Sequence, residues 1–415
     1  MGPRRQPTTF AALPEPSGYA GTATVHRLVT HRIRRRGPFT EIRTTDPRGS
    51  GMYGSDSERP RPGARTGGGG ARRTAARSRF AAGGACVLAA ALLAGCSSDP
   101  GPEKGGDSAD GGGGQGQRPK SVTPYWVDPR SNAARQADAY REDGKGRQAE
   151  QMRKIAGQPV AEWIGTEDPG GQTRKVVGAA AKADREALLV LYNLPHRDCG
   201  QYSKGGAPDA GAYRAWLDQV VKGIGKRAAT VIVEPDAIPH VLMEGCTPEQ
   251  FQPERFRLLN EAVGKLKSLP RTKVYLDAGN PDWVRDPGGL VEPMKRAGID
   301  KADGFSLNVS NYQTTESNAA YGRKFSPMVG NKPFVIDTSR NGNGPVAGAG
   351  ADEEAWCNPP GRALGEAPTT KTGDKLIDGY LWIKRPGESD GECKGGPKAG
   401  QWWPEYALGL VRNKR

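Results

Sequence analysis

Short apolar runs alternate with longer amphipathic stretches from about residue 120 to the end of the chain. Each run is rich in Val, Ile, Leu, Phe or Tyr and is bounded by polar residues, Gly or Pro, which is typical of buried strands. Strands that alternate with helices form parallel sheets. The pattern therefore predicts an α/β fold with seven parallel strands, over residues 160–164, 187–192, 229–233, 273–276, 305–309, 334–336 and 380–383.

Two of the intervening stretches carry apolar residues at the spacing of one helix face. We expect helices over residues 208–226 and 253–269. The apolar face of the first comprises Tyr213, Trp216, Leu217 and Val220, and that of the second comprises Phe256, Leu259, Val263 and Leu266.

Polar residues follow the predicted strands with unusual regularity. The carboxyl ends of parallel strands in a barrel lie on one face, where such enzymes build their sites. A single Asp in this position is often a helix cap or an ion-pair partner. The repetition at six strands instead favours a functional site. Its candidate members are Tyr192, Asp198, Glu234, Asp236, Asp277, Asn308, Asn311, Asp337, Lys384, Glu388 and Asp390.

Charge is distributed unevenly, and this changes the interpretation of the net charge of +14. Residues 1–95 hold 16 Arg, no Lys and five acids, so they carry +11 of the total. The remainder is nearly balanced and lacks a basic run interleaved with aromatic residues. We therefore expect no nucleic-acid binding, although the basic total would have suggested it.

The basic front end has the pattern of an export signal. Four arginines (Arg72, Arg73, Arg77 and Arg79) precede the apolar run 80–94, whose fifteen residues are shorter than the roughly 20 of a membrane-spanning helix. The run ends in Leu-Ala-Gly-Cys96, which resembles a bacterial lipobox. We expect Cys96 to be lipidated and to become the mature N-terminus. A simple secretory signal, with Cys96 incidental, is the alternative.

These features divide the chain into four parts. Residues 1–51 are expected to be a non-native or disordered leader, 52–95 a lipoprotein signal peptide, 96–119 a linker rich in Gly, Ser and Asp, and 120–415 one globular domain. The protein is then an exported lipoprotein, anchored to the outer face of the cytoplasmic membrane or later released.

Histidine and cysteine counts limit the chemistry of the domain. Only His196 and His240 lie in it, so a His-dependent triad or a multi-His metal site is poorly supplied, and carboxylate chemistry is favoured. A mechanism that uses carboxyls and water implies no metal or organic cofactor. Its four cysteines, in an exported protein, predict two disulfides with three possible connectivities. They are Cys199, Cys246, Cys357 and Cys393.

Five segments resemble the motifs of family 6 glycoside hydrolases, the cellulases that hydrolyse β-1,4-glucan with inversion. They are LYNLPHRDCG (191–200), VIVEPDAIP (231–239), YLDAG (275–279), WCNPPGRALG (356–365) and LWIKRPGESDG (381–391). The resemblance covers residues 120–415 in the same order. It implies a single catalytic domain with a distorted, seven-stranded relative of the TIM-like β/α barrel, and a β-1,4-glucan as substrate.

The resemblance also implies roles for individual residues. Asp236 matches the general acid, Asp198 the carboxylate that raises the pKa of the acid, and Asp390 the proposed base, an assignment that is disputed within the family. Substrate-binding roles are implied for Tyr192, Asp277, Lys384 and Glu388, with Asn308 and Asn311 as further candidates. The family's disulfide pairing would join Cys199 to Cys246 and Cys357 to Cys393.

Aromatic side chains are expected to stack on sugar rings, because the faces of these rings present C–H groups. By resemblance, Trp163 and Trp356 flank the non-reducing side and Trp283 stacks on the leaving side. Trp402 and Trp403 are expected to pack in the core, within the closing helix. Both histidines are expected to orient loops. Asn280 departs from the family's usual His after YLDAG, which puts the strength of leaving-side binding in doubt.

The compact domain favours an open site and therefore an endo-acting monomer. An exo-acting cellobiohydrolase is the alternative within the enzyme class. A carbohydrate-binding lipoprotein that has lost catalysis is a second alternative, disfavoured because Asp236, Asp198 and Asp390 are all present. We recognise no separate carbohydrate-binding module, so soluble or released glucan is the expected substrate rather than crystalline cellulose.

Overall fold

A computed structural model describes residues 123–348 and 355–414. The predicted leader, signal peptide, lipidation site Cys96 and linker all lie outside these residues. The described part contains one sheet of seven strands. Its strands are β1 (Glu162–Trp163), β2 (Ala187–Leu191), β3 (Ala229–Val233), β4 (Thr272–Asp277), β5 (Gly304–Leu307), β6 (Phe334–Asp337) and β7 (Ile377–Leu381).

The seven strands are parallel, as predicted, and they lie side by side in chain order. No ladder pairs β1 with β7 among the described residues. Instead, the segments that flank these strands meet: Ala161 N donates to Trp382 O at 3.0 Å, and the Trp163 indole donates to Ile383 O at 2.9 Å. The sheet is therefore a curled, incompletely closed barrel, which confirms the predicted class of fold.

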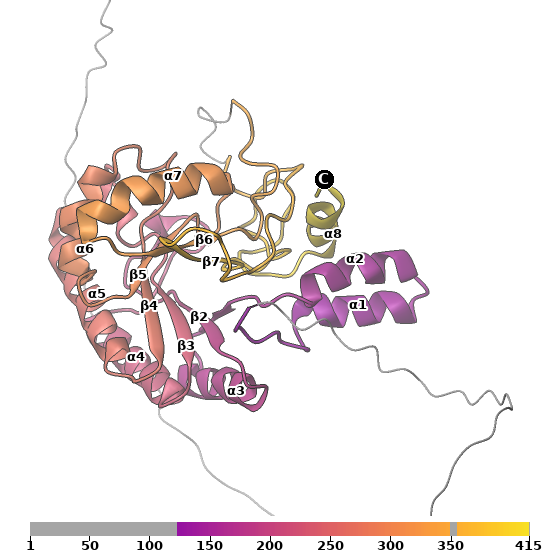
Figure 1. The fold of residues 1–415 in the computed structure, drawn as a ribbon, viewed down its shortest axis with the longest axis horizontal. Coiled ribbons are helices and arrows are strands. Elements are labelled where there is room, and N and C mark those ends of the chain that lie inside the picture. Colours follow the sequence, from indigo (N-terminus) through magenta and orange to yellow (C-terminus); the bar gives the residue numbers. More distant parts are fainter. Residues whose placement is uncertain (1–122, 349–354, 415) are drawn as a thin grey trace, which may run out of the picture. The chain divides into compact units, whose positions relative to one another are not determined.

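Helices follow most of the strands and cover the outer face of the curled sheet (Figure 1). Both amphipathic segments that the sequence indicated are helical, with their apolar faces buried. The helices are α1 (Asn132–Glu142), α2 (Gly146–Ala156), α3 (Pro169–Lys182), α4 (Ala210–Ile224), α5 (Gln252–Lys267), α6 (Val291–Ala297), α7 (Thr315–Phe325) and α8 (Pro404–Arg412).

Both faces of the sheet are buried, which explains why its strands are nearly continuous apolar runs. In β2, Leu189 and Leu191 point to the core under the helices, whereas Leu188 and Val190 point into the barrel interior. The same alternation continues past the last paired residue of β2. It therefore turns Tyr192 inward as well, towards the end of the barrel where the polar residues gather.

The predicted position of the last strand was displaced by about three residues. The apolar run 380–383 suggested the strand, but β7 ends at Leu381. Beyond it, the backbone N–H groups of Ile383 and Lys384 donate to the carboxylate of Asp337, at 3.3 and 2.9 Å, instead of continuing the ladder. A buried carboxylate thus ends this strand, and hydropathy alone does not record that.

Trp402 and Trp403 lie immediately before α8 and not within it, which corrects the expected position. Trp402 is half-buried and packs against the small apolar cluster formed by α1, α2 and α8, and the Trp403 ring stacks on Tyr406. No helix among residues 123–348 and 355–414 is both long and apolar enough to cross a bilayer.

Candidate active site

The backbone is strained where the strands end. Several non-glycine residues there adopt positive φ, a left-handed conformation that is costly for residues with a Cβ and that clusters at functional sites. This strain marks the carboxyl end of the sheet as the place where geometry has been selected over stability. The residues are Asp198 (62°), Glu234 (47°), Asp236 (71°), Asn308 (64°) and Ser310 (57°).

Asp236 is the centre of an acidic group at this end of the sheet. Its half-buried carboxyl accepts a hydrogen bond from the Tyr192 hydroxyl at 3.4 Å, and its backbone N–H donates to the Asp277 carboxylate at 2.9 Å. Burial raises the pKa of Asp236 well above its usual range, and the nearby charges of Asp277 and Asp198 raise it further. Asp236 is therefore placed to hold a proton near neutral pH.

Asp277 ends β4 and is fully buried. Besides the Asp236 amide, it accepts hydrogen bonds from the Ser306 hydroxyl at 3.2 Å and the Gly279 amide at 3.4 Å. Burial raises its pKa to about 6, although these hydrogen bonds act in the opposite direction. Its side chain is fully enclosed by protein, so Asp277 acts on the site through its charge and through the Asp236 backbone.

Asp198 lies in a tight turn after β2. Its carboxylate accepts a hydrogen bond from the backbone N–H of Ser203, and burial raises its pKa despite that bond and the neighbouring Arg197. The next residue, Cys199, is bonded to Cys246, with the two Cα atoms 4.8 Å apart. This disulfide ties the turn of Asp198 to the segment that follows Asp236, as the family pairing predicted.

Two buried carboxylates that we assigned no role organise the strand ends. Glu234 accepts the backbone N–H groups of Asn193 and Leu194, both at 2.9 Å, and so joins the ends of β2 and β3. Asp337 accepts backbone N–H groups from three segments and joins β5, β6 and β7. Its donors are Ser310 (3.0 Å), Ser339 (2.9 Å), Ile383 (3.3 Å) and Lys384 (2.9 Å).

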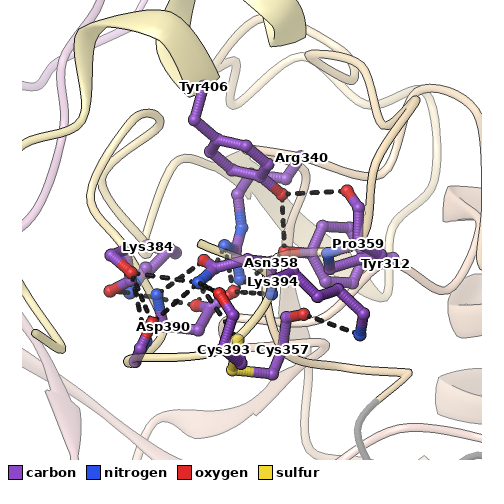
Figure 2. Close-up of a disulfide and its surroundings, with 12 residues drawn as sticks. Tyr312, Arg340, Cys357, Asn358, Pro359, Lys384, Asp390, Cys393, Lys394 and Tyr406 are labelled. Carbon is purple, nitrogen blue, oxygen red and sulfur yellow. Dashed lines mark hydrogen bonds and ion pairs between the residues drawn. A yellow bond between two sulfur atoms is a disulfide. The ribbon is translucent and has the colours of Figure 1, made fainter. Parts of the chain in front are cut away.

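Asp390 occupies a different electrostatic environment, shown in Figure 2. The guanidinium of Arg340 contacts both of its oxygens, at 2.8 and 2.9 Å, and the Lys384 ammonium lies 3.2 Å away. Burial alone would raise the pKa of Asp390, but these two cations outweigh burial and lower the pKa to about 2. Asp390 is therefore anionic at any working pH.

Further donors hold the Asp390 carboxylate in place. The Tyr312 hydroxyl donates to it at 3.0 Å and the Asn358 backbone N–H at 3.1 Å, while Tyr406 shares a hydrogen bond of 3.0 Å with Tyr312. We did not predict Arg340, Tyr312 or Asn358. Arg340 follows a strand-end aspartate by three residues, the same signal that identified the other candidates, so it could have been found.

The second disulfide joins Cys357 to Cys393, with Cα atoms 6.3 Å apart, again as the family pairing predicted. It links the segment of Asn358 to the segment of Asp390 (Figure 2). The turn of Asp198 reaches the same place, because the Tyr202 ring lies so close to Gly391 that a Cβ there would come within 2.3 Å of it. The fold thus brings the segments of Asp198 and Asp390 together.

The three candidate sugar-stacking tryptophans are half-exposed, and each is supported by a neighbour. Trp163 meets the Tyr192 ring edge-on at 5.5 Å, and Trp356 lies 6.1 Å from Tyr202. Trp283 meets His240 edge-on at 5.1 Å, and the side chain of Asn280 accepts its backbone N–H at 3.1 Å. All three remain candidate stacking residues. Asn280, which stands where the resemblance would give His, supports the turn that carries Trp283.

Besides the enclosed Asp277, three of the predicted substrate-binding residues do not present a free side chain. Asn308 is fully buried, and its amide bonds the backbone of Asp337 and Gln313, so it supports the loop rather than facing a substrate. Glu388 is buried, and its carboxylate pairs with the Arg385 guanidinium at 3.0 Å. Lys384 is only 9% exposed, and its ammonium pairs with the Asp390 carboxylate. Asn311 is half-buried and stays a prediction.

Cys199, His240 and Cys246 lie within 4.8 Å of one another, the spacing of a metal site. The two sulfurs are bonded to each other, however, so neither is available as a thiolate ligand. The imidazole of His240, whose pKa burial lowers to about 3, is left as a neutral packing partner of Trp283.

A carboxyl with a raised pKa and a second one that stays anionic, both beyond the carboxyl ends of a parallel β/α sheet, fit the class of acid–base hydrolases. The model of the glycosyl hydrolases family 6 matches residues 120–414. The chain belongs to this family.

Individual relatives are similar over most of the domain. Endoglucanase A of Cellulomonas fimi is 41% identical over 301 residues, which are 72% of this chain and 63% of that protein. Endoglucanase 1 of Streptomyces halstedii is 41% identical over 298 residues, 69% of this chain and 88% of that protein. The chain thus spans less than two thirds of the first relative's length and most of the second's.

A solved structure has the same fold. It is the endoglucanase Cel6 of Mycobacterium tuberculosis in complex with methyl-cellobiosyl-4-deoxy-4-thio-β-D-cellobioside. The two chains are 40% identical and superpose with a TM-score of 0.65, over 71% of this chain and 99% of the other.

Proposed function

We propose that the chain hydrolyses β-1,4-glucosidic bonds in cellulose or related β-glucans, with inversion at the anomeric carbon. The group of Asp236, Asp277 and Asp198 carries this proposal, because protonation of a glycosidic oxygen requires a carboxyl whose pKa its surroundings have raised. Membership of family 6 and the endoglucanases among the relatives support the same reaction.

Asp236 is the proposed general acid. It donates its proton to the leaving oxygen as the bond from that oxygen to the anomeric carbon breaks. The Tyr192 hydroxyl, already 3.4 Å from the carboxyl, then stabilises the new carboxylate. Asp198 and Asp277 keep the acid protonated until that step, because a second and third negative charge beside it disfavour its ionisation.

Inversion requires a water that attacks the opposite face of the sugar and a group that receives its proton. Asp390 is the candidate base. Its pKa of about 2 makes it a weak proton acceptor. Positive charge develops on the sugar in the transition state, however, and this makes the attacking water more acidic. A permanently ionised, fixed carboxylate can then accept the proton late in the reaction, directly or through a second water.

The acid role predicts a leaving-group dependence. Asp236→Ala should lower kcat on cello-oligosaccharides by about 10²–10⁴-fold, and much less on a dinitrophenyl cellobioside, whose leaving group needs no proton. Asp138→Ala, in an exposed ion pair on α1, is the control and should leave both rates unchanged. Equal losses on the two substrates would contradict an acid role for Asp236. Initial release of β-anomers, observed by NMR, would contradict inversion.

We also propose that the protein acts as an exported monomer anchored through a lipid on Cys96. The arginine-led apolar run and the Leu-Ala-Gly-Cys96 segment support this proposal. In a bacterial host, Cys96→Ser should move the protein from the membrane fraction to the soluble exported fraction and abolish labelling by radioactive palmitate. Unchanged labelling would place the lipid elsewhere or remove it from the proposal.

A further inference from the structure

Arg255 in α5 is a buried cation that pairs with no carboxylate in the described part of the chain. Its side chain is 3% exposed, and no carboxylate among the described residues forms an ion pair with it. Within residues 123–348 and 355–414, the guanidinium donates only to backbone carbonyls: NH1 to Ala237 O at 3.1 Å, and NH2 to His196 O at 2.7 Å and Pro195 O at 3.5 Å. Its Nε–H has no hydrogen-bond partner among these residues.

These carbonyls belong to the two loops that carry Asp236, the proposed acid, and Asp198, a carboxylate that raises the pKa of Asp236; we call these two residues the acid pair. Ala237 directly follows Asp236, and His196 precedes Asp198 by two residues. Arg255 itself is fixed on a helix whose neighbouring residues Phe256 and Leu259 are in the core. One planar group therefore spans both loops from a rigid support, which Lys with its single ammonium would reproduce only in part.

The charge of Arg255 also reaches the site. Desolvating a cation whose described hydrogen bonds all go to carbonyls is costly, so loop anchoring alone does not account for an arginine at this position. Its positive charge acts on Asp236, Glu234 and Tyr192, and it helps to keep His240 neutral. The other groups that act on the Asp236 carboxyl are Asp277 at the end of β4, and Asp198 and Tyr192 after β2.

We propose that Arg255 is a positioning residue for the acid pair: its guanidinium holds the loops of Asp198 and Asp236 together, and its charge opposes the surrounding carboxylates at Asp236. The proposal rests on the hydrolytic function proposed above. Without this cation, the Asp236 carboxyl would bind its proton more tightly and transfer it less readily.

The charge is tested by Arg255→Gln and Arg255→Met, with Arg257→Gln as matched control. Arg257 lies two residues along the same helix, is exposed and pairs with Glu254. The acid must be protonated, so kcat/KM falls as pH rises through the pKa of Asp236. Loss of the cation raises that pKa, and the falling limb should move up by about one pH unit in both Arg255 variants. An unmoved limb would overturn the electrostatic role, because a purely structural residue changes stability and rate without moving it.

The bridging of the two loops by the guanidinium, which we call the clamp, is tested by Arg255→Lys, because this variant keeps the positive charge. We expect the falling limb to stay in place while kcat decreases by about tenfold or more, because the two loops lose their common donor. Unchanged kcat would overturn the clamp.

If the uncharged variants fold but are inactive, ¹³C NMR titration of the labelled Asp carboxyls reports the pKa directly. If they do not fold, the same titration of Arg255→Lys, beside the wild type, must leave the acid's pKa unchanged; a shift of one unit or more would overturn the role of charge.

The two proposals fail in different ways. A wild-type protein that releases no reducing sugar from any β-glucan refutes the proposed function, whatever the variants do. A wild-type protein that hydrolyses glucan, with Arg255 variants indistinguishable from the Arg257 control, refutes only the role of Arg255.

Discussion

At the residue scale, the site separates two kinds of carboxyl by their surroundings. Asp236 is half-buried and Asp277 is buried, and this burial raises the pKa of each; the charges of Asp277 and Asp198 raise that of Asp236 further. Asp390 is just as enclosed, but Arg340 and Lys384 lower its pKa to about 2. Burial raises the pKa of all three carboxyls, and the deciding factor is whether cations pair directly with the carboxylate.

The raised pKa of Asp277 predicts a pH-dependent stability. Its pKa is about 6 in the folded state and 3.8 for an unperturbed group, so the folded state binds the proton more tightly. The stability this contributes is full below about pH 4 and is lost as pH rises through 6. Relative to Asp277→Asn, the wild-type free energy of unfolding should therefore fall by about 3 kcal/mol between pH 3.5 and pH 7.

Urea denaturation of the two proteins at several pH values measures this difference directly. Wild type and Asp277→Asn share every other titrating group, so the difference isolates the Asp277 carboxyl and its effect on Asp236. A difference that stays constant over this range would show that the carboxyl titrates alike in folded and unfolded chains.

At the element scale, segments remote in the sequence are joined at the carboxyl end of the sheet by buried anions and disulfides. Glu234 joins the ends of β2 and β3, and Asp337 joins those of β5, β6 and β7. The disulfides hold the longer loops that carry Asp198 and Asp390. These links keep the strand-end side chains fixed although their own loops are irregular, which is what acid–base catalysis needs.

The Cys357–Cys393 disulfide spans 36 residues, including β7 and the segment of Asp390. Its removal by a double Ala substitution should lower the free energy of unfolding by about 3–4 kcal/mol, because the unfolded chain regains the entropy of the open loop. Activity should decrease as well, since the Asn358 amide that holds Asp390 is fixed through this bridge. Denaturant titration without reductant measures the first effect; a loss below 1 kcal/mol would contradict it.

At the scale of the whole molecule, the proposed mode of action is endo. The described residues form one domain around a single sheet, and the two relatives named above are called endoglucanases. A site that accepts the middle of a chain cuts long polymers early. The viscosity of carboxymethyl cellulose should therefore fall sharply while little reducing sugar appears. Slow thinning with steady release of cellobiose would favour the exo alternative.

The sequence predicted the strands well because their apolar runs are local. For six of the seven strands, both predicted boundaries lie within two residues of those in the structure. Polar residues at the strand ends indicated the candidate site. It missed Arg340, Tyr312 and Asn358, whose partner Asp390 lies 50, 78 and 32 residues away in the chain. It also misjudged Asn308 and the extent of β7, because both depend on the carboxyl and carbonyl of Asp337, which is distant in sequence.

By itself, the sequence determined the parallel strands and the resemblance to family 6, because these reside in hydropathy and motif spacing. Only the tertiary structure decided which carboxyl holds a proton. Identical Asp side chains at equivalent strand ends acquired a raised pKa at position 236 and a lowered one at 390, because folding placed acids beside the first and cations beside the second. Distances between remote residues set that difference, and no local pattern encodes them.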